Sequence, residues 1–327
     1  MTKRIVIWLL VIFFVANVSV APAQQPGKIS RIGFLFSISP AANADRVEAF
    51  RQRLRELGYV EGKNIVIEYR EAGGKIEQLP ELATELVHLK MDVIVTAGPS
   101  PTRATKEATS TIPIVMTWDN DPVANGFVAS LARPGGNITG LSTLAPELTG
   151  KQLELLKEIV PKLSRVAVLG TSNQPGNAQL LREVELAAAA LKVQLQYLDI
   201  LGPKNIETAF RAATKGRADG VLALAGRGVF SHRRQVIDLA AKNRLPAIYP
   251  QSEYVEDEGL VSYGTNVADL YRRAAVYVDK ILKGAKPSDL PVEQPIKFEF
   301  IVNLKAAKQI GLTIPPNVLV RADRVIR

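Results

Sequence analysis

The sequence has no cysteine, only two histidines and few aromatic residues, which make up 6% of it. Without cysteine there can be no disulfide, no thiolate chemistry and no lipid-modified cysteine to tether the protein to a membrane. Both histidines, His88 and His232, fall on expected helices away from strand ends, and no metal-ligand spacing involves them. Neither a Gly-x-Ser-x-Gly sequence nor a phosphate-loop glycine pattern occurs. We therefore expect no catalytic activity, no metal and no cofactor.

A long apolar run occurs only at the N-terminus. Residues 1–23 have the pattern of a signal peptide, with Lys3 and Arg4 ahead of an apolar stretch at 5–15 and small residues before the expected cleavage site. The apolar stretch is shorter than the ~20 residues of a transmembrane helix, so an uncleaved membrane anchor is the less favoured alternative. We expect cleavage after about Ala23 and a mature protein that is free in the periplasm.

The formal net charge is +9, with the basic residues spread over the whole sequence. No basic stripe interleaved with aromatic residues is present, which disfavours nucleic-acid binding. The positive surface is expected to be solvated, or attracted to an anionic membrane or an acidic partner. Hydrophobic residues make up 47% of the chain, which is enough for buried cores in two domains.

Three short apolar runs recur in the same order in the two halves of the chain. Each is followed by a polar loop and an amphipathic stretch. The corresponding pairs are residues 30–36 and 164–170, residues 91–98 and 218–226, and residues 112–116 and 245–249. Strands that alternate with helices in this way predict an α/β protein with two doubly wound parallel-sheet lobes. Two similar lobes suggest a clamp for a small molecule.

The chain is expected to cross between the lobes more than once. The N-terminal lobe comprises residues 30–143 and is completed by a returning helix at about 266–284. The C-terminal lobe comprises residues 144–265, and residues 134–146 have the pattern of a first crossing. The tail at 285–327 is not assigned to either lobe.

The loops at the carboxyl ends of the strands are the expected binding region. Ligands of doubly wound sheets bind there, where helix N-termini also gather. Loops from both lobes would then line one cleft. The predicted ligand-binding residues are Phe36, Ser37, Gly98, Pro99, Ser100, Trp118, Asp119, Asn173, Ala225, Gly226, Tyr249, Thr265 and Asn266.

Several of these residues have two alternative roles. Gly98 allows close approach of the backbone to a ligand, and Ser100 either binds an anion or caps the helix that follows. Trp118 either stacks on a flat ligand or packs in the core. Asp119 either pairs with an ammonium group or forms a turn, and Arg227 either binds a carboxylate or is a solvated loop residue.

Several motifs resemble those of a known family. They lie at 57–64 (Leu-Gly-Tyr-Val-Glu-Gly-Lys-Asn), 121–123 (Asp-Pro-Val), 133–140 (Arg-Pro-Gly-Gly-Asn-Ile-Thr-Gly), 307–316 and 321–326. Through them the chain resembles the substrate-binding components of ABC-type importers, which have the type I periplasmic binding fold, and in particular the tryptophan-binding-protein-like branch. The resemblance implies a ligand held between the lobes and delivered to a membrane permease. The alternative to an importer component is a sensory protein that binds its ligand and reports to a membrane receptor. We expect the protein to be a monomer.

One position departs from the pattern of the relatives that the chain resembles. They commonly have an aspartate after the Tyr-Gly turn, where this chain has Asn266. A carboxylate at that position could hold the ammonium group of a ligand, and an amide is weaker at that task. The expected ligand is therefore a small apolar or aromatic carboxylate as well as an amino acid.

Overall fold

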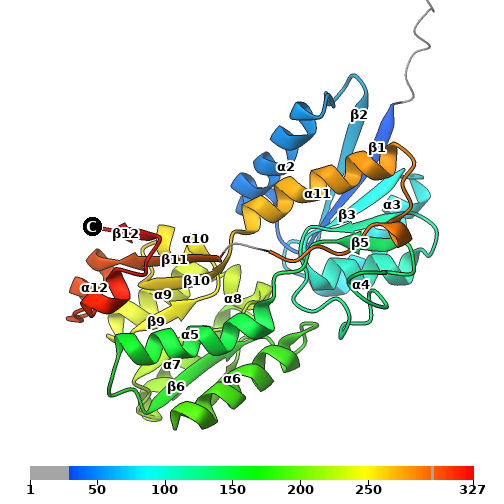
Figure 1. Cartoon of the computed structure of the whole chain (residues 1–327). Helices are drawn as coiled ribbons and strands as arrows, with labels where there is room; N and C mark the ends of the chain where they lie inside the picture. Colours follow the sequence, from blue (N-terminus) through cyan, green and yellow to red (C-terminus); the bar gives the residue numbers. More distant parts are fainter. Residues whose placement is uncertain (1–28, 296–297) are drawn as a thin grey trace, which may run out of the picture.

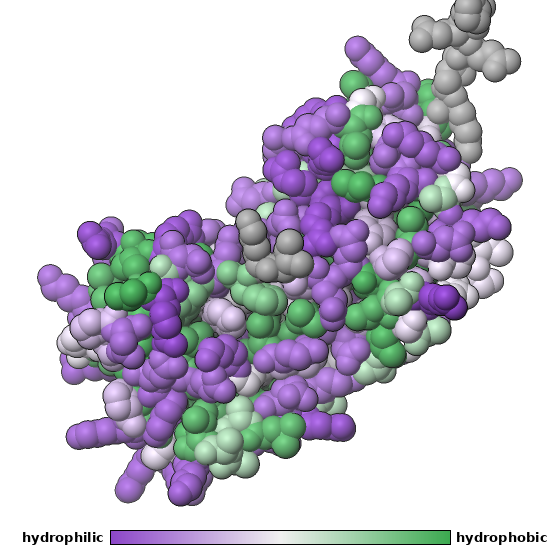
Figure 2. All heavy atoms as spheres, viewed as in Figure 1, coloured by the Kyte–Doolittle hydropathy of each residue, from purple (hydrophilic) through white to green (hydrophobic). Residues whose placement is uncertain are grey.

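The computed structural model describes residues 29–295 and 298–327, which form two α/β lobes (Figure 1). The expected signal peptide lies outside the described residues. Within the described part of the chain, every helix is too short or too polar to span a bilayer. Hydrophilic residues cover most of the face shown in Figure 2, while apolar residues occupy smaller patches.

The first lobe, drawn mainly in blue and cyan in Figure 1 with helix α11 in orange, contains a five-stranded sheet in the order β2-β1-β3-β4-β5, in which all pairs are parallel. Its strands are β1 (Ser30–Phe36), β2 (Ile65–Glu71), β3 (Val93–Thr96), β4 (Ile114–Met116) and β5 (Ile138–Gly140). Its helices are α2 (Ala44–Glu56), α3 (Leu79–His88), α4 (Pro99–Ala108) and α11 (Val267–Leu282), with short 3-10 turns at Pro40–Asn43, Ile76–Gln78 and Pro287–Asp289.

The second lobe contains a seven-stranded sheet in the order β12-β11-β10-β9-β8-β6-β7. Only the pair β10 and β11 is antiparallel. Its strands are β6 (Arg165–Gly170), β7 (Gln194–Asp199), β8 (Gly220–Ala223), β9 (Ala247–Tyr249), β10 (Val261–Thr265), β11 (Phe298–Asn303) and β12 (Arg324–Ile326). Its helices are α5 (Ala145–Ile159), α6 (Asn177–Leu191), α7 (Pro203–Lys215), α8 (Arg227–Phe230), α9 (Arg233–Lys242), α10 (Ser252–Glu256), α12 (Leu304–Gln309) and α13 (Pro316–Leu319). The prediction of two doubly wound lobes is confirmed.

The chain crosses between the lobes three times. It leaves the first lobe after β5, returns to it after β10, and leaves again between Glu293 and Phe298. Helix α11 lies against α2 in Figure 1, and its Leu270 and Ala274 share one core with Phe50 of α2. The tail adds β11 and β12 to the sheet of the second lobe, so each lobe is built from segments that are far apart in the sequence.

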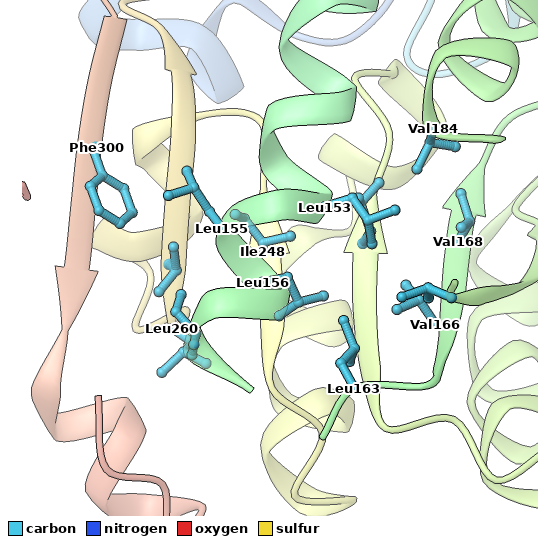
Figure 3. Close-up of a cluster of buried hydrophobic side chains, with 14 of the residues drawn as sticks. Leu153, Leu155, Leu156, Leu163, Val166, Val168, Val184, Ile248, Leu260 and Phe300 are labelled. Carbon is cyan, nitrogen blue, oxygen red and sulfur yellow. The ribbon is translucent and has the colours of Figure 1, made fainter. Parts of the chain in front are cut away.

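Helix α5 covers one face of the second sheet, although the sequence pattern did not predict it. Its Leu153, Leu155 and Leu156 point at the strands in Figure 3, where they meet Val166 and Ile248. The sequence pattern predicts a crossing that extends to Pro146, but α5 already begins at Ala145. The crossing is therefore short, at 141–144, and a buried helix follows it directly.

Candidate ligand-binding site

Two cavities lie side by side between the lobes. The first, which we call the cleft cavity, contains about 490 Å³ of empty space that is partly open to solvent. It is lined by Phe36, Ser37, Ile38, Asn43, Arg46, Ala97, Pro99, Ser100, Pro101, Trp118, Gln174, Gly226, Arg227, Phe230, Gln251 and Tyr271. The second, which we call the hinge cavity, lies beside the crossing segments and shares Trp118 and Gln251 with the first.

Strand ends supply most of the cleft cavity, as the parallel sheets require. Phe36 is the last residue of β1, and Trp118 follows β4 by two residues. From the second lobe, Gln174 follows β6 and Gln251 follows β9. The carboxyl ends of both sheets therefore face one another across the cavity.

An aromatic wall lines the cleft cavity on the side of the first lobe. Phe36 stacks on Phe34 with ring centroids 4.2 Å apart, and Trp118 and Tyr271 line the same cavity. Behind Trp118 lies Gly98, whose φ of +96° favours glycine. A Cβ atom at Gly98 would lie 2.7 Å from Cζ2 of Trp118, so the absence of a side chain lets the indole occupy this position.

Arg46 crosses the cleft from α2 and is only 4% exposed. Its Nε donates to Oε1 of Glu253 at 2.7 Å, and its Nη2 donates to Oε1 of Gln251 at 3.2 Å. Its guanidinium also lies 4.5 Å from the ring centroid of Phe230. Burial raises the pKa of Glu253, but the charge and hydrogen bonds of Arg46 outweigh this and the net pKa is lowered. Glu253 is therefore an ionised partner that fixes Arg46 to the second lobe.

Arg227 approaches the cleft cavity from the second lobe. Its Nη1 donates to the carbonyl of Gly74 across the cleft at 3.4 Å, and burial lowers the pKa of its guanidinium. Among the described residues it forms no ion pair, although the charge of Glu77 acts on it, and no aspartate or glutamate lines the cleft cavity. Its charge is therefore available to an anionic group in the cavity.

The predicted site residues divide into three groups. Phe36, Ser37, Pro99, Ser100, Trp118 and Gly226 line the cleft cavity. Ala225 and Thr265 line the hinge cavity, while Gly98 lies behind Trp118. The remaining four line neither cavity: Asp119, Asn173, Tyr249 and Asn266.

Two of these four are core residues. Asp119 is fully buried, and its Oδ1 accepts from Nδ2 of Asn125 at 2.8 Å and from the backbone N–H of Asp121 at 2.9 Å. Burial raises the pKa of Asp119 to about 7. Tyr249 is 1% exposed and stacks on Tyr254 with centroids 4.6 Å apart. These contacts give both residues roles in packing.

Of the other two residues, Asn173 lies at the surface and Asn266 lies at the start of α11. Asn173 is exposed. The Oδ1 of Asn266 caps α11 by accepting from the backbone N–H of Asp269 at 2.9 Å, and its Nδ2 donates to Glu299 at 2.8 Å. An aspartate here would place two carboxylates together, which explains the amide at this position. Ligand contact by Asn173 or Asn266 stays a prediction that these placements do not support.

The start of α4 corrects one expectation. The sequence pattern predicts a helix at 101–110 capped by Ser100, but the helix begins at Pro99 with Gly98 as its N-cap. Proline fits the first helical position because the missing N–H would have no intrahelical partner there. Ser100 therefore lies in the first turn, where it lines the cleft cavity.

Sequence reasoning missed Arg46, Gln174, Phe230 and Tyr271. One signal for Arg46 was present, since it precedes Phe50 by four residues and therefore lies on the apolar face of α2. An arginine on such a face needs a buried partner, and here that partner comes from the opposite lobe.

Residues 31–326 match the family described as ABC transporter substrate binding protein. The chain belongs to this family. Its members are substrate-binding proteins and not enzymes, which confirms both the resemblance and the expectation of a non-catalytic function.

Relatives and solved structures support the assignment to this family of substrate-binding proteins. A tyrosine-binding protein of Clostridioides difficile (strain R20291) is 26% identical over 265 residues, which are 81% of this chain and 76% of that protein. A conserved domain protein from Vibrio cholerae has a TM-score of 0.86 and 31% identity, covering 91% of this chain and all of that one. An ABC domain in complex with L-Trp from Streptococcus pneumoniae has a TM-score of 0.85 and 24% identity, covering 91% of this chain and 99% of that one.

Proposed function

We propose that this substrate-binding protein is the periplasmic receptor of an ABC importer, and that its ligand is a small aromatic carboxylate or an aromatic amino acid. The observation that supports this best is the composition of the cleft cavity. Phe36, Trp118 and Tyr271 offer flat apolar surface on one lobe, and Arg227 offers a positive charge without an ion-pair partner on the other. An aromatic acid has both complementary parts.

The charges around the cleft cavity favour the acid group over the amino group. The lining residues include two arginines, of which Arg46 is already paired with Glu253. An ammonium group would have only neutral oxygens to accept its hydrogen bonds, such as those of Ser37 and Ser100. A carboxylate is therefore the required group, and an amino group is tolerated.

The similar proteins agree with this ligand class. The relative from Clostridioides difficile is named for tyrosine, and the neighbour from Streptococcus pneumoniae is described in complex with L-Trp. Both ligands are aromatic and have a carboxylate. Closure of the lobes over such a ligand would bury it and create the surface that a permease recognises.

Thermal unfolding with a panel of compounds tests the ligand class. The panel contains aromatic amino acids, aromatic carboxylates that lack the amino group, and aromatic amines that lack the carboxylate. A ligand at about 100 times its dissociation constant adds about 2.7 kcal/mol to the free energy of unfolding. We expect both kinds of acid to stabilise the protein and the amines to have no effect. Stabilisation by the amines alone would overturn the proposal.

Arg227→Gln tests the carboxylate contact. We expect this variant to lose at least about tenfold in affinity for the acids, because a charged hydrogen bond contributes about 1.5–3 kcal/mol. Arg182→Gln, on the exposed face of α6, is the matched control and should bind like the parent protein.

Uptake of the labelled ligand by cells with and without the gene then tests import, and cell fractionation tests the periplasmic location.

A further inference from the structure

Gln251 lies where the two interlobe cavities meet, and its side chain lines both of them. It follows β9 by two residues and is only 8% exposed. It is also the N-cap residue of α10, but its side chain makes no capping hydrogen bond there. The amide group is therefore left to serve the space between the lobes.

Arg46 determines which way round the amide of Gln251 lies. Nη2 of Arg46 donates to Oε1 of Gln251 at 3.2 Å, from one lobe to the other. A guanidinium group has only donors, so the amide oxygen must face Arg46 and the amide nitrogen must face away from it. Nε and Nη1 of Arg46 are engaged as well, with Glu253 at 2.7 Å and with Asn43 at 3.4 Å. Arg46 is therefore a positioning residue, because its own donors are already used.

The amide nitrogen of Gln251 is the side-chain atom that remains for a ligand. Among the described residues Nε2 donates no hydrogen bond, and unlike the amide nitrogen of Asn120 it is not completely shut off from solvent. Buried N–H groups are nearly always paired, with protein or with water. No aspartate or glutamate of the described residues lines either cavity, so no carboxylate of the protein accepts from Nε2 there. A ligand oxygen would replace water at this donor.

A donor in a fixed orientation distinguishes between the groups that a ligand can bring to it. A carboxylate oxygen accepts from Nε2, and the hydrogen bond is then charge-assisted. An ammonium group has only donors, so it would face another N–H group and lose water without gaining an acceptor. Oε1 of Gln251, which could hold an ammonium group, is kept by Arg46. The orientation that Arg46 imposes thus favours acids over amines.

We propose that Gln251 is a specificity-determining residue, whose Nε2 donates to a carboxylate oxygen of the ligand while Arg46 holds its Oε1 from the opposite lobe. This inference rests on the proposed function, in which the ligand is an aromatic acid in the cleft cavity. Arg227 supplies the charge that attracts the acid, and Gln251 supplies a neutral donor whose direction disfavours an ammonium group. Because this direction depends on Arg46, the preference for acids requires the arrangement of the two lobes that the structure shows.

Gln251→Glu tests the assignment because it reverses the polarity of the atom that faces the ligand. The new carboxylate still offers one oxygen to Arg46, but it presents a second oxygen where Nε2 was. Calorimetry compares 3-phenylpropanoate with L-phenylalanine, and indole-3-propanoate with L-tryptophan, since the members of each pair differ by one amino group. We expect the ratio of the two affinities to shift by at least about tenfold towards the amino acid, because a donor to the acid is lost and an acceptor for the ammonium group is gained.

Two further variants complete the test. Gln309→Glu, at an exposed glutamine of α12, adds the same charge outside the cleft and should keep the affinity ratio of the parent protein. Gln251→Met keeps the length of the side chain but has no donor, so it should weaken binding of both members of each pair by about tenfold. This second variant keeps the inference testable if Gln251→Glu does not fold.

The outcomes separate this inference from the proposed function. If Gln251 serves only as an acceptor for Arg46, Gln251→Glu will keep the affinity ratio of the parent protein, because its carboxylate still accepts from Arg46. An unchanged ratio in Gln251→Glu, or unchanged affinity for the acids in Gln251→Met, would overturn the inference and leave the proposed function standing. If no aromatic acid binds to the parent protein, the proposed function fails and this inference fails with it.

Discussion

Arg46 Nε and Glu253 Oε1 lie 2.7 Å apart across the cleft, which joins α2 of the first lobe to α10 of the second. Both side chains are largely buried, at 5% and 22% exposure. A buried ion pair that bridges two moving bodies stabilises only the arrangement in which they touch. Arg46 and Glu253 therefore stabilise the arrangement of the two lobes that the structure shows.

Removing this contact should open the protein. We expect Arg46→Ala to increase the radius of gyration in small-angle scattering and to lower ligand affinity by about 1.5–3 kcal/mol, the range for hydrogen bonds to charged groups. Arg51 lies on the same helix as Arg46 and forms an exposed ion pair with Glu61, so Arg51→Ala should change either quantity little. An unchanged radius of gyration in Arg46→Ala would show that the pair does not control closure.

Trp118 should dominate apolar contact with the ligand. We expect Trp118→Ala to weaken binding by at least ~1 kcal/mol, because an indole face is lost from the cleft cavity, and Trp118→Phe to retain part of the affinity. The other tryptophan is Trp8, in the expected leader, so tryptophan fluorescence of the mature protein, excited where tyrosine does not absorb, reports on Trp118 alone. If both variants bind the ligand with the affinity of the parent protein, Trp118 does not contact the ligand.

Gly98→Ala should change the shape of the cleft cavity by displacing the indole of Trp118. The new methyl group would lie 2.7 Å from Cζ2 of Trp118, and φ at this position is +96°, so both the indole and the backbone must move. We expect a changed fluorescence spectrum, weaker ligand binding and a loss of about 1–3 kcal/mol in stability, because this combination of φ and ψ is one that residues other than glycine rarely adopt.

Gly202→Ala is the control for Gly98→Ala. Gly202 has an extended backbone and open space where its Cβ would be. If Gly98→Ala matches Gly202→Ala in fluorescence and affinity, close packing of the indole on the backbone has no part in shaping the site.

Asp119 should make stability fall as the pH rises. Burial raises the pKa of Asp119 from its ordinary 3.8 to about 7, so between these values the folded protein binds more protons than the unfolded chain. Stability is therefore lost over that range. We expect Asp119→Asn, which keeps an acceptor for Asn125, to remove this loss and to exceed the parent in stability above about pH 7 by a few kcal/mol. Urea unfolding at several pH values measures this, with the exposed Asp238→Asn as control. Parallel pH profiles for Asp119→Asn and the parent would contradict the assignment.

The fold was predictable because its signal is local. Buried strands such as residues 32–36 and 93–96 are continuous apolar runs, and α2 repeats Val47, Phe50 and Leu54 at helical spacing. Helix α5 was missed because it begins directly after a crossing and its N-cap is Leu144, an apolar residue in the left-handed conformation that makes no side-chain capping hydrogen bond.

The site was less predictable because it depends on contacts between lobes. Trp118 and Phe36 follow strand ends, and this position alone was enough to place them in the cleft. Tyr249 also ends a strand, but it is turned into the core beside Tyr254, and strand position does not reveal that. Arg46 is buried by residues that follow it by more than 200 positions, so no local pattern contains its partner.

The three crossings also determine when each lobe can be completed as the chain is made. The core of the first lobe includes Leu270 and Ala274 of α11, which lie beyond the β10 strand of the second lobe. The sheet of the second lobe ends with β12, three residues long and next to the C-terminus. A chain that emerges from its N-terminus therefore cannot finish either lobe early. With the periplasmic location that we propose, this order would delay completion of both cores until almost the whole chain has crossed the inner membrane.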